Sequence, residues 1–482
     1  FFAEDLVFKL KKPVRYSFLD YSTLEKRRIY CQEELRLNRR LAPSVYIGVM
    51  PITFDDLGWR LGGWAEPAEY VLVMRRLPEK RMLPFLLDTG QVTAAMMREL
   101  AVLLAHFHKN AERVRSVDAA QYPSLVRRQW CDNSADFKPF LGAAIDEEAL
   151  RTVDQFAMDF IASHGGLLER RVKQGWLRDV HGDLHAEHVC FAPEGIQIFD
   201  CVEFEPKFRQ CDLASEIAFL AMDIEARGNS GLVEPFLTHY GELLEDNQFR
   251  ELLPFWKAYR ALVRAKVYAL RGAEGFATAQ RYLRYALRLA WERRQPFLVL
   301  VSGFTGSGKS TVAKALSERL GVPNINSDVV RKALAGKTGP QSEGYLEGIY
   351  SPAMTEKTYA KMARAAEKLI ASGTAAILDA TFTQRAQRQR MARLAAKHHV
   401  PILQIHCSVA EETVQQRLIQ RAAQGLDVSD GRWEIYLQQK ATFEALDEPE
   451  PGACLELVTD LPADKLASIC ERFLRARLES QS

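Results

Sequence analysis

The chain has 482 residues, of which 47% are hydrophobic and 26% charged, and its formal net charge is +2. This composition is that of a globular protein and excludes a disordered chain. The chain is longer than a single hydrophobic core ordinarily supports, so we expect two or three domains. The small net charge gives no overall attraction to nucleic acid or to a membrane surface. No apolar run approaches the roughly 18 residues that a membrane span needs.

The eight cysteines are scattered without a Cys-x-x-Cys pair or a zinc-ligand spacing. This usage is typical of reduced thiols and predicts a cytoplasmic protein. The sequence opens at Phe1 without a methionine and shows no signal peptide. We therefore also weigh the interpretation that a segment is missing from the N-terminus.

The first part of the chain alternates short apolar runs with longer helical patterns. The predicted strands are 5–14, 45–52 and 70–74, and the predicted helices are 24–41 and 91–114. Pro43 stops the first helix, and the second carries an apolar stripe at helical spacing. A mostly helical segment is expected to continue to about residue 175.

A compact pair of strands follows. Residues 176–191 end in an apolar stretch, a Pro/Gly turn occupies 192–195, and 196–200 form a second short strand that ends at Asp200. Each strand has a carboxylate near one end, Asp183 and Asp200. Such an arrangement predicts a site for a metal ion and a base.

The run His181-Gly-Asp-Leu-His-Ala-Glu-His188 resembles the aminoglycoside phosphotransferase-like branch of the protein kinase fold. The resemblance implies that Asp183 accepts or orients the proton of a substrate hydroxyl and that Asp200 binds metal. It also implies an ATP-contacting lysine with a glutamate partner on the following helix, and a hinge beside adenine. The corresponding residues are Lys9, then Glu33 or Glu34, and Met74.

Two departures from that family pattern stand out. Position 188 is histidine where the family has asparagine, and imidazole suits softer metals than Mg²⁺, so His188 is a candidate metal ligand with its metal left open. The glycine-rich loop expected before the lysine strand is not in the sequence. Lys11 is the alternative to Lys9, and His181 and His185 are more often structural hydrogen-bonding groups than catalysts.

Residues 255–294 are helical and strongly basic. A nucleic-acid surface is one interpretation. A helix face that is solvated, or packed against the acidic side of a neighbouring domain, is the commoner outcome, and we favour it. We place the domain boundary at Gln295-Pro296, which predicts a first domain at 1–295 and a second at 296–482.

The second domain opens with a phosphate-binding loop. An apolar strand at 297–302 leads into Gly303-x-x-x-x-Gly308-Lys309-Ser310 and then a helix, which is the strand–loop–helix context that such a loop requires. Backbone N–H groups of the loop and the positive end of the helix predict binding of ATP phosphates. Lys309 is expected to reach the β- and γ-phosphates and Ser310 to hold Mg²⁺. The predicted nucleotide-binding residues are Gly303, Thr305, Gly306, Ser307, Gly308, Lys309, Ser310 and Thr311.

Further polar residues follow later strands of this domain. Asp328 and Arg331 come just after a short second strand, and a buried strand at 375–382 carries Asp379 and Thr381 near its end. Arg417 and Arg421 share one face of a helix at 411–422. A charged loop at 425–432 follows. Because ligands of parallel sheets bind beyond the carboxyl ends of the strands, Asp328 is expected to face the γ-phosphate. We assign Asp379 no catalytic role.

This half of the chain resembles the P-loop kinases of the gluconate kinase, polynucleotide kinase and zeta-toxin group. The resemblance implies that Asp328 is the substrate-side base with Arg331 beside it. It also implies that Arg417 and Arg421 close over ATP.

Together the features predict a multidomain α+β and α/β protein. The N-terminal part has a protein-kinase-like fold, and the C-terminal part has a parallel P-loop NTPase sheet sandwiched by helices. The pairing resembles bacterial fusions of an aminoglycoside phosphotransferase-like domain with a P-loop kinase. We predict a two-headed, ATP- and Mg²⁺-dependent phosphotransferase with a small-molecule hydroxyl acceptor and no membrane partner. The alternatives are a nucleotide-dependent switch and a polynucleotide 5′-hydroxyl kinase.

Overall fold

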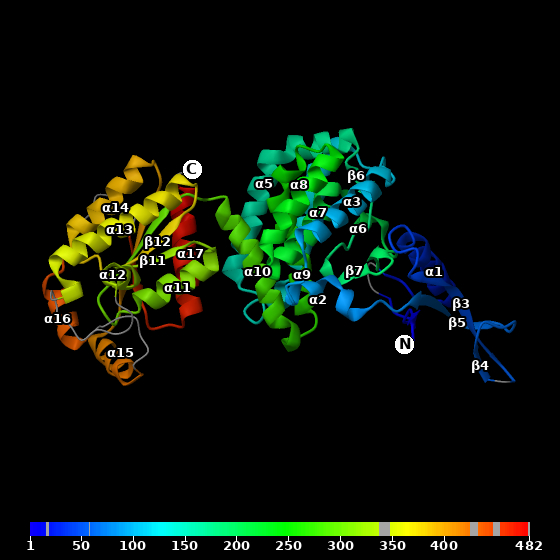
Figure 1. Ribbon diagram of the computed structural model, residues 1–482, viewed down its shortest axis with the longest axis horizontal. Helices are drawn as coiled ribbons and strands as arrows, with labels where there is room; N and C mark the ends of the chain where they lie inside the picture. The colour runs from blue at the N-terminus through cyan, green and yellow to red at the C-terminus, as the bar shows by residue number, and fades with distance from the viewer. Residues whose placement is uncertain (16–18, 57, 337–347, 425–431, 447–453, 481–482) are drawn as a thin grey trace. The chain divides into compact units, whose positions relative to one another are not determined.

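The computed structural model describes residues 1–15, 19–56, 58–336, 348–424, 432–446 and 454–480, with the side chains of 421–424 left out. The chain divides into two compact units (Figure 1). Unit 1 comprises Phe1–Asp146 and Val153–Ala286, and unit 2 comprises Glu147–Thr152 and Leu287–Ser482. The predicted boundary after residue 295 stays a prediction. Among the described residues, no helix combines the length and the apolar character needed to cross a bilayer.

Unit 1 begins with a five-stranded antiparallel sheet in the order β1-β2-β5-β3-β4. The strands are β1 (Phe2–Ala3), β2 (Leu6–Leu10), β3 (Tyr46–Asp55), β4 (Gly58–Leu61) and β5 (Pro67–Arg75). Helix α1 (Leu24–Asn38) begins after Thr23, whose hydroxyl accepts the N–H of Lys26, and it contacts β3 and β5. Because β5 is the central strand, its residues 71–74 are buried, which accounts for their uniformly apolar sequence.

The rest of unit 1 is mainly helical and holds two short antiparallel ribbons. The helices are α2 (Leu83–Asp88), α3 (Ala94–Asn110), α4 (Tyr122–Ala135), α5 (Glu147–Gln174, which begins in unit 2), α6 (Pro206–Arg209), α7 (Leu213–Ala226), α8 (Val233–Leu244), α9 (Phe249–Ala269) and α10 (Ala273–Glu292, which ends in unit 2). One ribbon joins β6 (Leu177–Asp179) to β9 (Gln210–Asp212), and the other joins β7 (Val189–Ala192) to β8 (Gly195–Ile198). Asp183 precedes β7 and Asp200 follows β8, so the ribbons position both carboxylates.

Several basic side chains of α9 point into unit 1. Lys257, Arg260 and Arg264 are buried. Lys257 forms an ion pair with Glu225 at 2.7 Å, and Arg264 forms one with Glu187 at 3.0 Å. These two charges are thus paired with acidic residues of the same unit, whereas the interpretation from sequence named a solvated face or the acidic side of a neighbouring domain.

Unit 2 is built on a five-stranded parallel sheet in the order β11-β12-β10-β13-β14. The strands are β10 (Leu298–Ser302), β11 (Asn324–Asn326), β12 (Ala376–Asp379), β13 (Ile402–Ser408) and β14 (Cys454–Val458). The helices are α11 (Lys309–Leu320), α12 (Ser327–Ala335), α13 (Pro352–Ala371), α14 (Arg385–Lys397), α15 (Glu411–Gln424), α16 (Trp433–Ala441) and α17 (Ala463–Glu479). The predicted C-terminal parallel sheet is confirmed.

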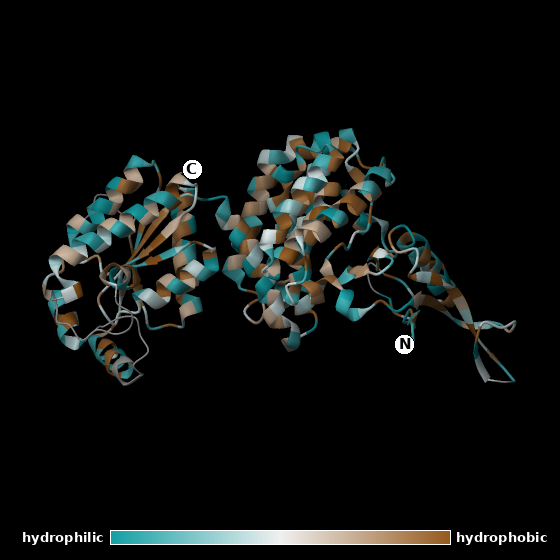
Figure 2. Cartoon of the chain, in the orientation of Figure 1, coloured by the Kyte–Doolittle hydropathy of each residue, from teal (hydrophilic) through white to brown (hydrophobic). Residues whose placement is uncertain are grey.

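The core of unit 2 follows the alternation of its strands. Leu298, Leu300 and Leu378 form one cluster with apolar side chains of α13 and α14. The intervening residues Val299 and Val301 are also fully buried, because successive strand residues point to opposite faces and helices cover both. Figure 2 shows the hydrophobic colour on these central strands, with hydrophilic residues on the outer sides of the surrounding helices.

A buried ion pair joins two distant segments of unit 1 and gives a test of the fold. The Arg171 guanidinium donates to both carboxylate oxygens of Asp212, at 2.6 and 2.8 Å, and neither side chain is exposed. Asp212 also accepts the N–H of Ala214 and so caps α7.

We expect Asp212→Ala to destabilise unit 1 by about 3–5 kcal/mol, because the change leaves the buried Arg171 guanidinium with Asp246 as its one remaining carboxylate, at 2.8 Å, and removes a helix cap. Urea unfolding followed by tryptophan fluorescence measures the shift. The matched control is Glu25→Ala, which breaks the exposed pair with Arg28 and should leave the midpoint unchanged. Equal midpoints for Asp212→Ala and the parent chain would contradict the assignment.

Candidate functional site

The loop between β10 and α11 depends on three glycines with positive φ. These angles are 143° at Gly303, 79° at Gly306 and 85° at Gly308. A Cβ added to Gly303 would lie 2.4 Å from the carbonyl oxygen of Cys407, and one added to Gly306 would lie 2.7 Å from Cγ1 of Val414. The loop therefore lies directly on β13 and α15, in a conformation that only glycine accommodates.

The same loop carries polar groups that fit a phosphate ligand. The hydroxyls of Thr305 and Ser307 are buried and, among the described residues, have no hydrogen-bond partner. Lys309 is half-buried at the start of α11, and Ser310 and Thr311 are exposed beside it. Buried hydroxyls next to a helix N-terminus suit an anion, so the residues present fit the predicted nucleotide phosphates.

Asp379 lies at the end of β12, the strand beside β10, at the same edge of the sheet as the glycine loop. Its Oδ2 accepts a hydrogen bond from Nδ2 of Asn326 at 2.6 Å. Burial raises the pKa of Asp379 above the usual carboxyl range, and the nearby charge of Lys309 and the hydroxyl of Ser310 act against that rise. The sequence alone assigns Asp379 no catalytic role, although its position at the end of a buried strand is a usable signal for a site residue.

Asp328 and Arg331 lie on the first turns of α12, next to β11. The Arg331 guanidinium donates to Oδ1 of Asp328 at 2.7 Å. Asn326 caps this helix, because its Oδ1 accepts the N–H groups of Asp328 and Val329 at 2.9 and 3.1 Å. One asparagine thus contacts both Asp379 and the backbone of Asp328.

Of the two arginines predicted to close over ATP, the structure describes the side chain of Arg417 and not that of Arg421. Arg417 donates to the carbonyl oxygen of Thr459 at 2.6 Å, to its hydroxyl at 3.1 Å and to the carbonyl oxygen of Gly306 at 3.5 Å. It therefore lies beside the glycine loop. The side chain of Arg421 and most of the predicted loop at 425–432 lie outside the described residues.

Two contacts of the loop were not anticipated from sequence. Oε1 of Gln439, on α16, accepts the backbone N–H of Thr305 at 2.8 Å. The Thr459 hydroxyl donates to the carbonyl oxygen of Ser307 at 2.6 Å. Neither residue lies within 100 positions of the loop, and neither belongs to a local motif that could have signalled the contact.

The second predicted site, in unit 1, is organised by ion pairs. Lys9 lies 2.7 Å from Oε1 of Glu34 and 2.6 Å from Oδ1 of Asp200. Glu33, which the sequence analysis also named, pairs instead with Arg36 and does not reach Lys9 in the structure. Lys11 is buried and pairs with Glu34 at 2.7 Å and with Glu203.

These pairs set the ionisation of the site. Burial acts to raise the pKa of Asp200, but the ammonium of Lys9 outweighs it, and the pKa falls to about 2. Burial likewise acts to lower the pKa of Lys9, and the charges of Asp200 and Glu34 hold it well above its usual range. Both groups are therefore charged at neutral pH.

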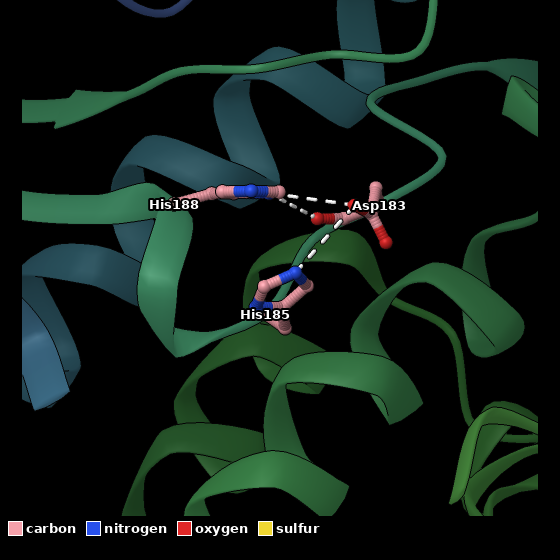
Figure 3. Close-up of side chains that lie close together, drawn as sticks. All are labelled: Asp183, His185 and His188. Atoms are coloured by element: carbon pink, nitrogen blue, oxygen red, sulfur yellow. Dashed lines mark hydrogen bonds and ion pairs between the residues drawn. The ribbon is translucent and has the colours of Figure 1, made fainter. Parts of the chain in front are cut away.

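Asp183 lies in the turn before β7, between two imidazole rings that point toward it (Figure 3). Its Oδ2 is 3.5 Å from Nε2 of His185 and 3.7 Å from Nδ1 of His188. The turn itself is held from behind, because Glu216 accepts the N–H groups of His181 and Gly182. Burial raises the pKa of Glu216 to about 7.

His181 is held by a backbone hydrogen bond, and Met74 packs in a hydrophobic cluster. Nε2 of His181 donates to the carbonyl oxygen of Phe199 at 2.9 Å, and burial lowers the pKa of this imidazole to about 3, so the ring is neutral. Met74, the predicted start of a hinge, is buried near the end of β5 and packs with Tyr46 and Leu72. Its role beside adenine stays a prediction.

Over most of its length the chain is similar to mycobacterial proteins. It is 33% identical over 432 residues to the uncharacterized protein Rv2004c of Mycobacterium tuberculosis, a match that covers 89% of this chain and 85% of the relative. The chain belongs to the Rv2004c family. The uncharacterized protein Mb2027c of Mycobacterium bovis matches with the same identity and coverage.

Within this member of the Rv2004c family, a family model described as an AAA domain matches residues 298–446. Together with the glycine loop and the parallel sheet, that match shows an AAA-type P-loop domain. Solved structures that resemble it include a gluconokinase from Sinorhizobium meliloti, with 19% identity, 39% of this chain and 99% of that chain covered, and a TM-score of 0.29. The Mycobacterium tuberculosis APS kinase CysC in complex with AMPPNP and APS is 19% identical, with 38% of this chain and 98% of that chain covered and a TM-score of 0.29.

We expect Gly303→Ala to weaken ATP binding by unit 2 more than about tenfold, which corresponds to roughly 1.4 kcal/mol. The added methyl group meets the Cys407 carbonyl and forces the loop away from β13. Equilibrium dialysis with labelled ATP measures the loss. Gly373→Ala is the matched control, because Gly373 has a φ of 80° and open space around its Cα. Unchanged ATP binding by Gly303→Ala would contradict the geometry assigned to the loop.

Proposed function

We propose that this member of the Rv2004c family is an ATP-dependent phosphotransferase that phosphorylates a hydroxyl group of a small molecule. The observation that carries the proposal is the convergence at one sheet edge of unit 2. The glycine loop follows β10, Asp379 ends β12, and Asp328 begins α12 after β11. Ligands of parallel α/β sheets bind at this edge.

The proposed roles follow from chemistry and position. Backbone N–H groups of the loop and Lys309 would hold the β- and γ-phosphates, and Ser310 with Asp379 would hold Mg²⁺ through oxygen ligands. The metal neutralises charge on the phosphates when it is bound. Arg417 already contacts the loop, and its guanidinium is suited to the charge that spreads over the transferring group.

Asp328 would orient the acceptor hydroxyl and accept its proton. Its hydrogen bond to Arg331 keeps the carboxylate fixed and leaves its second oxygen for the substrate. Asn326 positions this group relative to Asp379 through one amide. Phosphoryl transfer needs little more than such positioning and charge neutralisation, so the proposal asks nothing unusual of these residues.

We expect Asp328→Asn to lower the transfer rate by about 10²–10⁴-fold while ATP affinity stays unchanged, because the amide cannot accept the proton. Lys309→Ala should instead weaken ATP binding. Transfer from γ-labelled ATP into a small-molecule extract measures the rate, and the labelled product reveals the acceptor class. Asp464→Asn, on the exposed start of α17, is the control.

Two results would count against the proposed reaction. Asp328→Asn with the parent rate would remove Asp328 as the proton acceptor. A parent chain that binds ATP but labels no small molecule would favour the alternative of a nucleotide-dependent switch, and a labelled oligonucleotide end would favour the polynucleotide kinase.

We further propose that unit 1 is a second nucleotide-binding head with an aminoglycoside phosphotransferase-like, protein-kinase-like fold. Support comes from the Lys9–Glu34 pair, which joins a sheet lysine to a helix glutamate, and from Asp200, which reaches the same lysine. In this head Asp183 would face the acceptor hydroxyl. The aminoglycoside name describes the fold resemblance and implies no drug substrate.

The two heads predict two ATP sites per chain. We expect isothermal titration to give a stoichiometry near two for the parent chain and near one for either Lys309→Ala or Lys9→Met. Lys80→Met, on the exposed face of unit 1, is the control for the second change. A parent stoichiometry of one that Lys309→Ala abolishes would contradict the second head and leave the first in place.

A further inference from the structure

The turn that carries Asp183 also carries two histidines, and the three side chains gather at one point. One potential ligand atom from each of Asp183, His185 and His188 lies within 4.8 Å of the other two. Figure 3 shows both rings directed at the carboxylate. Asp183 and Glu187 are more than a third exposed, so solvent reaches the cluster.

Nε2 of His185 faces two neighbours with opposite requirements. It lies 3.1 Å from Nη1 of Arg264, which only donates, and 3.5 Å from Oδ2 of Asp183, which as a carboxylate only accepts. A proton on Nε2 leaves Arg264 without an acceptor there, and its absence leaves Asp183 facing a second acceptor. Among the described residues, Nδ1 of His185 is buried without a hydrogen-bond partner and lies 4.0 Å from Oε2 of Glu187.

His188 is in a similar conflict. Its Nδ1 lies 2.9 Å from the carbonyl oxygen of Asp183 and 3.7 Å from Oδ2 of that residue, and its Nε2 lies 3.5 Å from Oδ2 of Asp200. A carbonyl oxygen only accepts, so the 2.9 Å contact places the proton of a neutral His188 on Nδ1, and Nε2 then faces Oδ2 of Asp200 as acceptor against acceptor. An ion bound at Nδ1 would move that proton to Nε2 and remove this repulsion.

We propose that Asp183, His185 and His188 bind one divalent transition-metal ion of the Mn²⁺, Co²⁺ or Zn²⁺ class. The ligand atoms are Oδ2 of Asp183, Nε2 of His185 and Nδ1 of His188. Imidazole suits these ions, whereas Mg²⁺ prefers an all-oxygen shell. Metal–ligand bonds of about 2.0–2.2 Å place tetrahedral ligand atoms roughly 3.3–3.5 Å apart. The two spacings from Asp183, 3.5 and 3.7 Å, are near that value, and the two histidine nitrogens lie within 4.8 Å of each other.

Two carboxylates lie behind the imidazoles, as outer partners of metal-bound histidines usually do. With the ion on Nδ1, His188 gives up its 2.9 Å hydrogen bond to the carbonyl oxygen of Asp183, and its proton is on Nε2, where Asp200 accepts it. Glu187 is the corresponding acceptor for Nδ1 of His185. Arg264 gives up its contact with Nε2 but keeps those with Glu187 at 3.0 Å and Tyr268 at 3.1 Å.

The metal site belongs to the second head of the proposed function. What the ion does there rests on that proposed function, whereas binding of the ion does not. Binding itself needs no nucleotide. It does change the part proposed for Asp183, because a carboxylate bound to the ion through Oδ2 presents only Oδ1 to a hydroxyl. Three protein ligands also leave a coordination position open for water or a phosphate oxygen.

The test uses the full chain without nucleotide. We expect Co²⁺ titration to give one site per chain with visible absorption bands, and Mn²⁺ bound there to show imidazole ¹⁴N coupling by pulsed electron paramagnetic resonance. Millimolar Mg²⁺ should not displace either ion. His185→Asn and His188→Asn should each weaken Co²⁺ binding more than about tenfold, since loss of even an outer partner costs 10–100-fold. His239→Asn, on α8, is the control.

Thermal unfolding without metal shows whether each variant is folded, and the ¹⁴N signal of the parent chain needs no variant at all. Absence of a one-to-one Co²⁺ site, or of ¹⁴N coupling, would overturn the proposal. Parent-like binding by His185→Asn would also overturn it and leave only His188 and Asp200 as ligands. Transfer activity of unit 2, assayed with Lys309→Ala as its reference, is independent of all these outcomes.

Discussion

The site of unit 2 depends on a close approach of backbone to backbone. Gly303 lies against the carbonyl group of Cys407 in β13, and Gly306 lies against Val414 in α15. This approach turns the chain sharply from β10 into α11 and directs the helix N-terminus at the sheet edge where β11 and β12 also end. The positions of Lys309 and Asp379 relative to each other follow from that turn, and glycine is the residue that permits it.

Unit 1 positions its polar groups by a different means. Lys9, Asp200, His188 and Asp183 form a continuous series of charged and polar contacts drawn from three segments of the chain. Because burying an unpaired charge is costly, each member constrains the next. Behind the series, Glu216 and Arg260 hold the backbone of Gly182, so the turn that carries Asp183 is supported from the helical side.

Part of the basic segment of α9 and α10 lies inside unit 1. An anionic partner for its lysines and arginines is one interpretation of the sequence and stays a prediction. In the structure, Lys257 and Arg264 are buried in ion pairs with Glu225 and Glu187, and Trp256 and Tyr282 belong to the core. Arg264 is also the neighbour of the histidine cluster, so this helix contributes charge to the interior of unit 1.

The sequence by itself determined the elements that rest on local patterns. The apolar run before Gly303 and the periodicity after Ser310 specify β10 and α11, and the helical patterns at 24–41 and 91–114 predict α1 and α3 to within a few residues. Only the tertiary structure decided which distant groups meet. Adjacent helix residues point about 100° apart, so the rotation of α1 on its sheet selects Glu34 over Glu33 for Lys9. Strand β14, Thr459 and Gln439 reach the glycine loop through packing between residues far apart in the chain, which no local pattern records.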